Sequence, residues 1–222
     1  MLMKSRKTNK RYRRYRAGGF SLIEMVTVLA LTIVLSVISV ITLVPIMNAQ
    51  HVTNAYNTTL AALRQARDNA VSQRTSYEVS FTQTTTAPIT TTISVLPTLA
   101  GFQGDQNTVN YLFPTDVFFL TPPSGTPAPD GFGTGANMVD FGYTANGNAG
   151  GATQTIIYFC PDGSAQTSST CSGAGMWDSG VVYMGRTGDK LSERAVSLYG
   201  GTGRIHGWRL YPSGSNYQWI RQ

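Results

Sequence analysis

A long, uninterrupted apolar stretch near the amino terminus dominates the hydrophobic pattern of this chain. Between Phe20 and Met47 only Glu24 is charged, and the 23 residues from Met25 to Met47 carry no charge at all. At 1.5 Å per residue, about 20 apolar helical residues cross a ~30 Å hydrocarbon core. A buried core helix is the alternative, but it would need a domain large enough to surround the whole stretch. The pattern therefore predicts a transmembrane helix over residues 20–47.

The apolar pattern continues past this stretch, but on one side only. Apolar residues recur at steps of three and four, at Val52, Tyr56, Leu60, Leu63, Ala66 and Ala70. This spacing predicts one long helix from Phe20 to about Ser72, whose amphipathic part over residues 48–75 offers one face for a domain to pack on. Pro45 removes a backbone donor and disfavours a straight helix just before it, so we expect a break there. A simple helix end at the membrane surface is the alternative.

Short apolar runs separated by turn signals fill the rest of the chain. Turns are indicated by Pro122-Pro123, Pro161-Asp162-Gly163 and Pro212-Ser213-Gly214, and the Pro- and Gly-rich stretch Thr121–Gly135 is expected to be an exposed loop. The predicted strands are Tyr77–Thr82, Ile89–Leu96, Val117–Leu120, Met138–Tyr143, Thr155–Phe159, Gly180–Met184, Arg194–Leu198, Ile205–Leu210 and Tyr217–Ile220. The expected fold class is α+β, with a long amino-terminal helix and an antiparallel β domain over residues 76–222.

Charge is distributed very unevenly along the chain. The formal net charge is +6, but eight of the 17 Lys and Arg residues lie within the first 16 residues, and no acidic residue precedes Glu24. The remaining chain has nine basic and eleven acidic residues, a net charge of −2. The overall excess of positive charge therefore does not make the whole protein nucleic-acid-binding. By the positive-inside rule, residues 1–19 stay in the cytoplasm and the body crosses the membrane.

The junction between the basic block and the apolar helix has a distinctive order of residues. Gly18 and Gly19 precede the apolar stretch, and the run Gly19-Phe20-Ser21-Leu22-Ile23-Glu24-Met25 follows. This run resembles the class III signal of type IV pilins and pseudopilins. The resemblance implies that a prepilin peptidase cuts after Gly19, removes the leader 1–19 and methylates the new terminal Phe20.

The same resemblance implies a role for Glu24. An intramembrane carboxylate costs at least about 2.5 kcal/mol and needs a partner. In the family this partner is the terminal amine of a neighbouring subunit, so Phe20, Glu24 and Pro45 are expected to serve assembly. A Glu24 close enough to the interface to reach lipid headgroups is the alternative.

A second run refines the resemblance. Residues 63–74, Leu-Arg-Gln-Ala-Arg-Asp-Asn-Ala-Val-Ser-Gln-Arg, followed by the strand-like Tyr77–Phe81, are similar to GspH/FimT-type pseudopilins, with Asp68-Asn69 where a Ser-Glu pair is common. Gly203-Arg204-Ile205, Trp208-Arg209 and Trp219 resemble the closing hairpins of that family. The resemblance implies a minor pilin or pseudopilin in type II secretion or type IV pilus biogenesis. Its partners would be prepilin peptidase, other pilins and an inner-membrane assembly platform, and its body would lie in the bacterial periplasm.

The two cysteines, Cys160 and Cys171, flank a loop rich in Gly, Ser and Thr. Outside the inner membrane they can form a disulfide, and two free buried thiols are the alternative. His51 and His206 provide no recognisable zinc spacing with them. Neither a metal site nor a cofactor is predicted. The common hydrolase and phosphate-loop motifs do not occur, so no enzymatic activity is predicted, and His206 is expected to be a surface strand residue.

The body itself has an acidic and a basic part. Residues 75–185 contain seven acidic residues and no Lys or Arg, whereas residues 186–222 have a net charge of +4. Some FimT-type minor pilins are DNA receptors that use a basic carboxy-terminal region, so Arg204, Arg209, Arg221 and Trp208 are candidate DNA-binding residues. Pairing of this edge with the acidic face of a neighbouring subunit, or simple solvated charges, are the alternatives.

Overall fold

The computed structural model describes residues 19–98, 108–143, 149–171 and 177–222. The chain divides into two compact units with a boundary after Pro45. In the described residues, the first unit consists of the first half of the amino-terminal helix. The second unit, residues 46–222, contains the rest of that helix and all the strands.

Helix α1, Leu22–Gln73, confirms the predicted long helix. It continues through Pro45, so the expected break and the alternative helix end at that residue are both wrong. A proline removes only its own N–H bond and crowds one preceding carbonyl, so the hydrogen bonds of the turns on either side can carry the helix past it. Beyond Pro45, one stripe of α1 is buried, as the spacing predicted. The buried residues are Val52, Ala55, Tyr56, Thr59, Ala62, Leu63, Ala66 and Ala70.

The first sheet is antiparallel and has five strands in the order β3-β2-β1-β7-β8. These strands are β1 Ser76–Gln83, β2 Thr91–Thr98, β3 Val109–Leu112, β7 Ile156–Phe159 and β8 Ala165–Gln166. Strand β1 follows α1 almost directly and alternates between buried and half-buried residues over most of its length. That alternation directs Val79 and Phe81 into the core.

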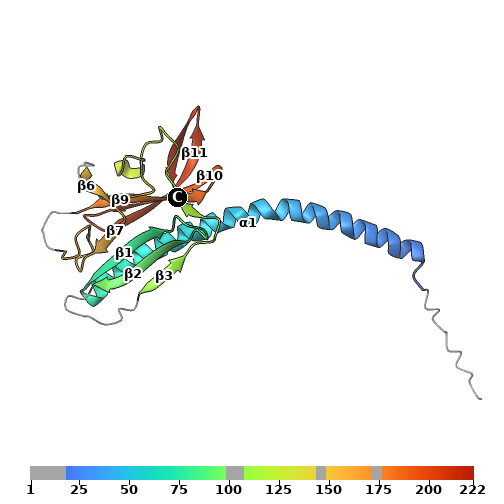
Figure 1. The fold of residues 1–222 in the computed structure, drawn as a ribbon, viewed down its shortest axis with the longest axis horizontal. Coiled ribbons are helices and arrows are strands. Elements are labelled where there is room, and N and C mark those ends of the chain that lie inside the picture. Colours follow the sequence, from blue (N-terminus) through green and yellow to red (C-terminus); the bar gives the residue numbers. More distant parts are fainter. Residues whose placement is uncertain (1–18, 99–107, 144–148, 172–176) are drawn as a thin grey trace, which may run out of the picture. The chain divides into compact units, whose positions relative to one another are not determined.

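The second sheet has seven strands, in the order β12-β11-β10-β9-β5-β6, with β4 paired to one end of β9. These strands are β4 Phe118–Phe119, β5 Val139–Tyr143, β6 Ala149–Gln154, β9 Ser179–Arg186, β10 Asp189–Tyr199, β11 Arg204–Ser213 and β12 Asn216–Arg221. The last four form a meander in which each strand pairs with the next. Figure 1 shows both sheets and the β11–β12 hairpin.

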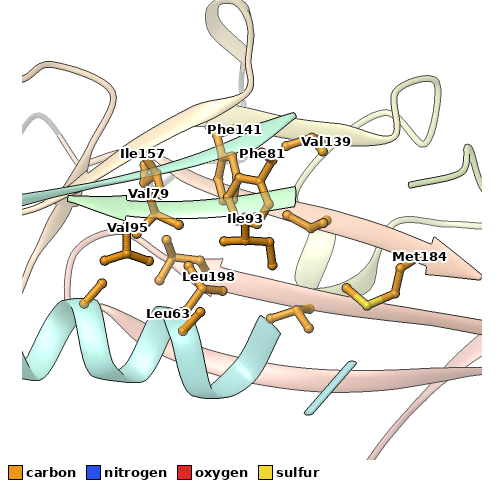
Figure 2. Packing of buried hydrophobic residues seen from close by; sticks show 14 of the residues in the cluster. Leu63, Val79, Phe81, Ile93, Val95, Val139, Phe141, Ile157, Met184 and Leu198 are labelled. Carbon is orange, nitrogen blue, oxygen red and sulfur yellow. The ribbon is translucent and has the colours of Figure 1, made fainter. Parts of the chain in front are cut away.

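The main hydrophobic core lies where the second half of α1 meets side chains from both sheets. Figure 2 shows Leu63 of α1 next to Leu198 of the second sheet, with Val79 and Ile93 of the first sheet above them and Met184 of the second sheet further along the core. All five side chains are fully buried. Helix and sheets therefore share one core.

The stretch Thr121–Gly135 is a loop, as predicted, and most of its residues are exposed or half-buried. Four residues are nevertheless buried, namely Pro122, Thr126, Pro129 and Phe132, and a short 3-10 turn, η1 Pro129–Gly131, contacts β10. The Pro and Gly residues of this loop form turns. The loop also packs on the second sheet and covers part of the face that does not carry the main core.

Candidate functional site

The first half of α1 presents an apolar surface with no cover in the described chain. Its large apolar side chains, from Phe20 to Met47, are all at least half exposed. By length and composition this is the one helix among the described residues that could cross a membrane. It is therefore a candidate single-pass membrane anchor near the amino terminus.

The hydroxyl side chains of this segment are satisfied within the helix. Ser36 Oγ donates to the Thr32 carbonyl over 2.7 Å, and Ser39 Oγ donates to the Leu35 carbonyl over 2.9 Å. Thr27, Thr32 and Thr42 bond to preceding turns in the same way. Hydroxyl groups with such internal partners can enter hydrocarbon without leaving donors unpaired.

The residues expected at the processing site lie at the exposed start of α1. Gly19 and Phe20 precede the helix and are exposed, and the Ser21 carbonyl accepts the backbone N–H of Glu24 over 3.0 Å. A Cβ at Gly19 would meet nothing within 4 Å. Glu24 lies in the first turn, where the helix dipole favours a carboxylate, and it forms no ion pair with any described residue. Gly18 lies outside the described residues.

An ion-paired cluster connects the beginning of the packed half of α1 to the second sheet. Asp116 lies between His51 of α1 and Arg186 at the end of β9. Its Oδ1 is 2.9 Å from His51 Nδ1, and its Oδ2 is 2.8 Å from Arg186 Nε. No local sequence pattern predicts this cluster, because the three residues lie far apart in the chain.

Cys160 and Cys171 form a disulfide, with 5.7 Å between their Cα atoms. The bond closes the turn after β7, and this turn approaches α1 closely. Arg67 Nε donates to the Gly163 carbonyl over 3.3 Å, and a Cβ at Gly203, in the β10–β11 turn, would overlap both of these residues. Only glycine fits at Gly203, which also has a φ of +60°.

The predicted nucleic-acid-binding residues do not share one surface. In β11, Gly207 abuts Tyr56 of α1, so alternation places Arg209 on the face toward the helix and Trp208 on the opposite face. Arg221 pairs with Trp208 across the β11–β12 ladder and shares that opposite face. The Trp208 indole N–H donates to Ser197 Oγ over 2.8 Å, and its ring packs against a small cluster with Trp219. Trp208 is therefore largely a packing residue.

A different set of basic residues lies along the boundary between α1 and strands β10 and β11. We define the arginine groove as Arg64, Arg67, Arg194, Arg204 and Arg209. Arg64, Arg67 and Arg204 line a pocket of about 300 Å³ together with Asp68. Within the described residues, none of the five arginines forms an ion pair. Arg204 and Arg209 were expected from the basic carboxy-terminal region, whereas the helix residues Arg64 and Arg67 were not, because they lie far from that region in the chain.

Arg194 and Arg209 make this groove electrostatically unfavourable in the isolated chain. They are direct cross-strand partners, and like charges in such positions destabilise a sheet. Burial, followed by the neighbouring Arg209 charge, lowers the pKa of Arg194. Arg209 stacks over the Tyr211 ring, 5.2 Å from its centre, and its Nε is buried without a hydrogen-bond acceptor in the described chain. The groove is therefore suited to an anionic partner.

His206 is less exposed than predicted for a surface strand residue. Its side chain is 13% exposed, and Nδ1 lies 2.9 Å from Asp130 Oδ2. The loop Thr121–Gly135 supplies this aspartate. Among the described residues, no group of three or more His, Cys, Asp or Glu side chains could hold a metal ion.

We compared the chain with protein-family models, curated proteins and solved structures, and none of them matches. Its function must therefore be inferred from its own residues and their geometry.

Proposed function

We propose that this protein is a structural subunit of a type IV filament system, a minor pilin or pseudopilin that serves type II protein secretion or type IV pilus biogenesis. The observation that carries the proposal is the division of α1. Its first half exposes apolar side chains along its whole length, whereas its second half is buried in the body. Lipid can surround the exposed first half of such a helix before assembly, and the helices of other subunits can surround it in the filament.

The residues at the start of α1 support the same proposal. Phe20 would become the terminal residue after cleavage following Gly19, and its amine would be free to pair with Glu24 of a neighbouring subunit. Glu24 has no partner among the described residues of its own chain. A buried ionic group without a partner is costly in hydrocarbon, so such a pairing would favour assembly in a fixed axial register.

The arginine groove supports contacts between bodies. It combines five arginines that form no ion pair within the described part of the chain, whereas residues 75–185 contain seven acidic residues and no basic one. A groove that meets the acidic part of the next subunit would form a head-to-tail contact, and contacts of this type generate open helical filaments. Such pairing would also relieve the repulsion between Arg194 and Arg209.

Processing of Gly19 variants tests the proposal. The full chain is expressed in bacterial membranes with and without a prepilin peptidase, and its mass is measured. The wild-type chain should lose residues 1–19 and gain one methyl group, whereas Gly19→Val should remain uncut. A Cβ at Gly19 has no neighbour within 4 Å, so this change does not disturb the fold. Unprocessed wild-type chain in the presence of an active peptidase contradicts the proposal.

DNA binding is a second candidate function, favoured by the presence of the partly exposed Tyr211 beside Arg209 of the arginine groove. Arginines interleaved with aromatic rings can bind a phosphate backbone and stack on bases. A gel-shift measurement with the full chain should then show DNA binding that Arg64→Ala together with Arg204→Ala reduces. An Arg221→Ala control, outside the groove, should retain it. Absence of a shift at low salt removes this candidate.

A further inference from the structure

A separate pocket lies on the face of the second sheet opposite α1. It has a volume of about 280 Å³ and is lined by Asp130, Phe132, Tyr199, Thr202, Arg204 and His206. We call it the Tyr199 pocket, and we propose that it binds a single neutral sugar ring. The pocket shares Arg204 with the arginine groove, but its other lining residues lie outside that groove, and the inference does not depend on the proposed function.

Two aromatic rings form the apolar part of the pocket. Phe132 comes from the covering loop and Tyr199 from the end of β10, and their ring centres are 5.9 Å apart with an angle of 34° between the planes. Phe132 is buried and supports Tyr199, which remains partly exposed. A partly exposed aromatic ring at a pocket wall provides a flat apolar surface, and the C–H face of a pyranose ring is a matching flat apolar surface.

The polar part of the pocket is fixed by a hydrogen-bond network. Asp130 Oδ2 accepts from Ser197 Oγ over 2.5 Å and from His206 Nδ1 over 2.9 Å. Ser197 Oγ in turn accepts the Trp208 indole N–H. These contacts hold the carboxylate and the imidazole in place before any ligand arrives, so little ordering is needed on binding.

The network leaves the Nε2 of His206 unused. The Nδ1 of the ring donates to the Asp130 carboxylate, so only Nε2 of the two ring nitrogens faces no protein partner. This Nε2 is buried and has no hydrogen-bond partner in the described residues. A buried polar atom without a partner costs free energy, and a ligand hydroxyl group, which can donate or accept, would supply that partner.

The charges of the pocket select among ligand classes. Asp130 disfavours a simple anion, and the exposed Arg204 beside it disfavours a simple cation. A polyol satisfies both, because its hydroxyl groups bond to the His206 Nε2, donate to the Asp130 carboxylate and accept from Arg204. The hydroxyl of Thr202 can do either. The pocket lies just below the size range of sites for drug-sized ligands, about 300–1,000 Å³, which fits one ring better than a longer compound.

The test measures sugar binding by the full chain in a detergent without a sugar headgroup. Saturation-transfer NMR is recorded with methyl β-glucopyranoside, methyl β-galactopyranoside and N-acetylglucosamine, and with glycine and phosphate as charged probes. A dissociation constant of about 1–10 mM is expected for at least one sugar, as is typical for a ligand of this size. Tyr199→Leu and Arg204→Met should each weaken that binding about tenfold.

Matched controls on the same sheet are Tyr217→Leu and Arg221→Met, which do not line the pocket. They should bind the sugar as the wild-type chain does, and the thermal unfolding of all four variants shows whether each is folded. Failure of every sugar to bind at 50 mM overturns the proposal. Equal loss in the control variants, or binding of glycine or phosphate without any sugar, overturns it as well.

Discussion

At the scale of single residues, Glu193 is a carboxylic acid in an unfavourable position. It is buried, and its Oε2 has no hydrogen-bond partner among the described residues. Burial raises its pKa from the ordinary 4.5 to about 7, and the Asp189 charge adds to this effect while the Lys190 charge opposes it. The folded protein therefore keeps this proton over a pH range in which the unfolded chain has already lost it.

This difference predicts how stability depends on pH. Between pH 4.5 and 7 the folded state binds more protons at Glu193, so the free energy of unfolding falls as the pH rises and then levels off above 7. Glu193→Gln should remove this decline and stabilise the protein at pH 8, by at most about 3 kcal/mol, because one pKa unit corresponds to about 1.4 kcal/mol. Chemical unfolding of both proteins at pH 5 and pH 8, followed by tryptophan fluorescence, measures the effect. An equal pH dependence in the variant contradicts it.

At the scale of elements, one close approach fixes how α1 lies against the second sheet. Tyr56 of the helix is buried against Gly207 of β11, and a Cβ at Gly207 would overlap its hydroxyl group. Burial raises the pKa of Tyr56, and the nearby charges of Arg194 and Arg64 oppose that rise. The tyrosine thus fills the space that the missing side chain of Gly207 leaves.

Gly207→Ala should therefore destabilise the body by about 1–3 kcal/mol, the usual cost of overpacking. The Tyr56→Leu variant lacks the overlapping ring end, and in that background the same Gly207→Ala change should cost much less. Denaturant midpoints of the wild type, both single variants and the double variant provide this comparison. Simple additivity of the two changes would show that the predicted overlap does not determine the packing.

Strands were predictable from sequence where apolar residues alternate on one buried face. All nine predicted strands overlap observed ones. The missed strands lack the signal: β3 is mainly exposed, β8 has two residues, and β6 has the sequence Ala-Gly-Gly-Ala-Thr-Gln, in which small residues have low strand propensity.

Two strands continue through a proline before which they were predicted to end. Pro212 was expected to begin a turn, yet β11 continues to Ser213. The β10–β11 ladder ends at Arg209, so Pro212 pairs only with β12 and needs no donor on its other side. Pro97 of β2 likewise lies beyond the residues that pair with β3. A proline is tolerated in a strand where one edge is free, and a single sequence does not show which edge that is.

At the scale of the whole molecule, the disulfide joins the end of β7 to a segment 11 residues further on. Closing a loop of this length contributes roughly 3 kcal/mol in the chain-entropy estimate. We expect the double variant Cys160→Ala, Cys171→Ala to unfold at correspondingly lower denaturant concentration than the oxidised wild type. Reductant should shift the wild type toward the variant and leave the variant unchanged. Equal midpoints for the oxidised and reduced wild type contradict this expectation.

Assembly provides a second prediction at this scale, and it rests on the proposed function. Glu24→Ala should be cleaved normally but should enter filaments at least about tenfold less, because the terminal amine of its neighbour loses its partner. The control is Thr32→Ala, which removes a hydroxyl group bonded only within its own helix. Quantitative immunoblotting of sheared filaments and of membranes measures incorporation. Normal incorporation of the Glu24 variant contradicts the pairing.

The candidate sites were less predictable than the fold, because they are formed by residues that are distant in sequence. The apolar anchor was visible, since one continuous segment forms it. The arginine groove needs Arg67 of α1 beside Arg204 of β11, and the Tyr199 pocket needs Asp130 of a loop beside His206. Only the sheet order brings these pairs together, and local patterns do not specify the order of strands.

The burial of the second half of α1 has a mechanical consequence. A force applied along the helix axis would load the core contacts of many side chains at the same time, because one stripe of the helix contacts both sheets. The His51–Asp116–Arg186 cluster and the Arg67–Gly163 bond would resist the same displacement at two separate points along the helix. Contacts loaded in shear must break together, whereas contacts that are peeled break one at a time. We therefore expect the body to stay attached to its helix when the helix is pulled along its axis.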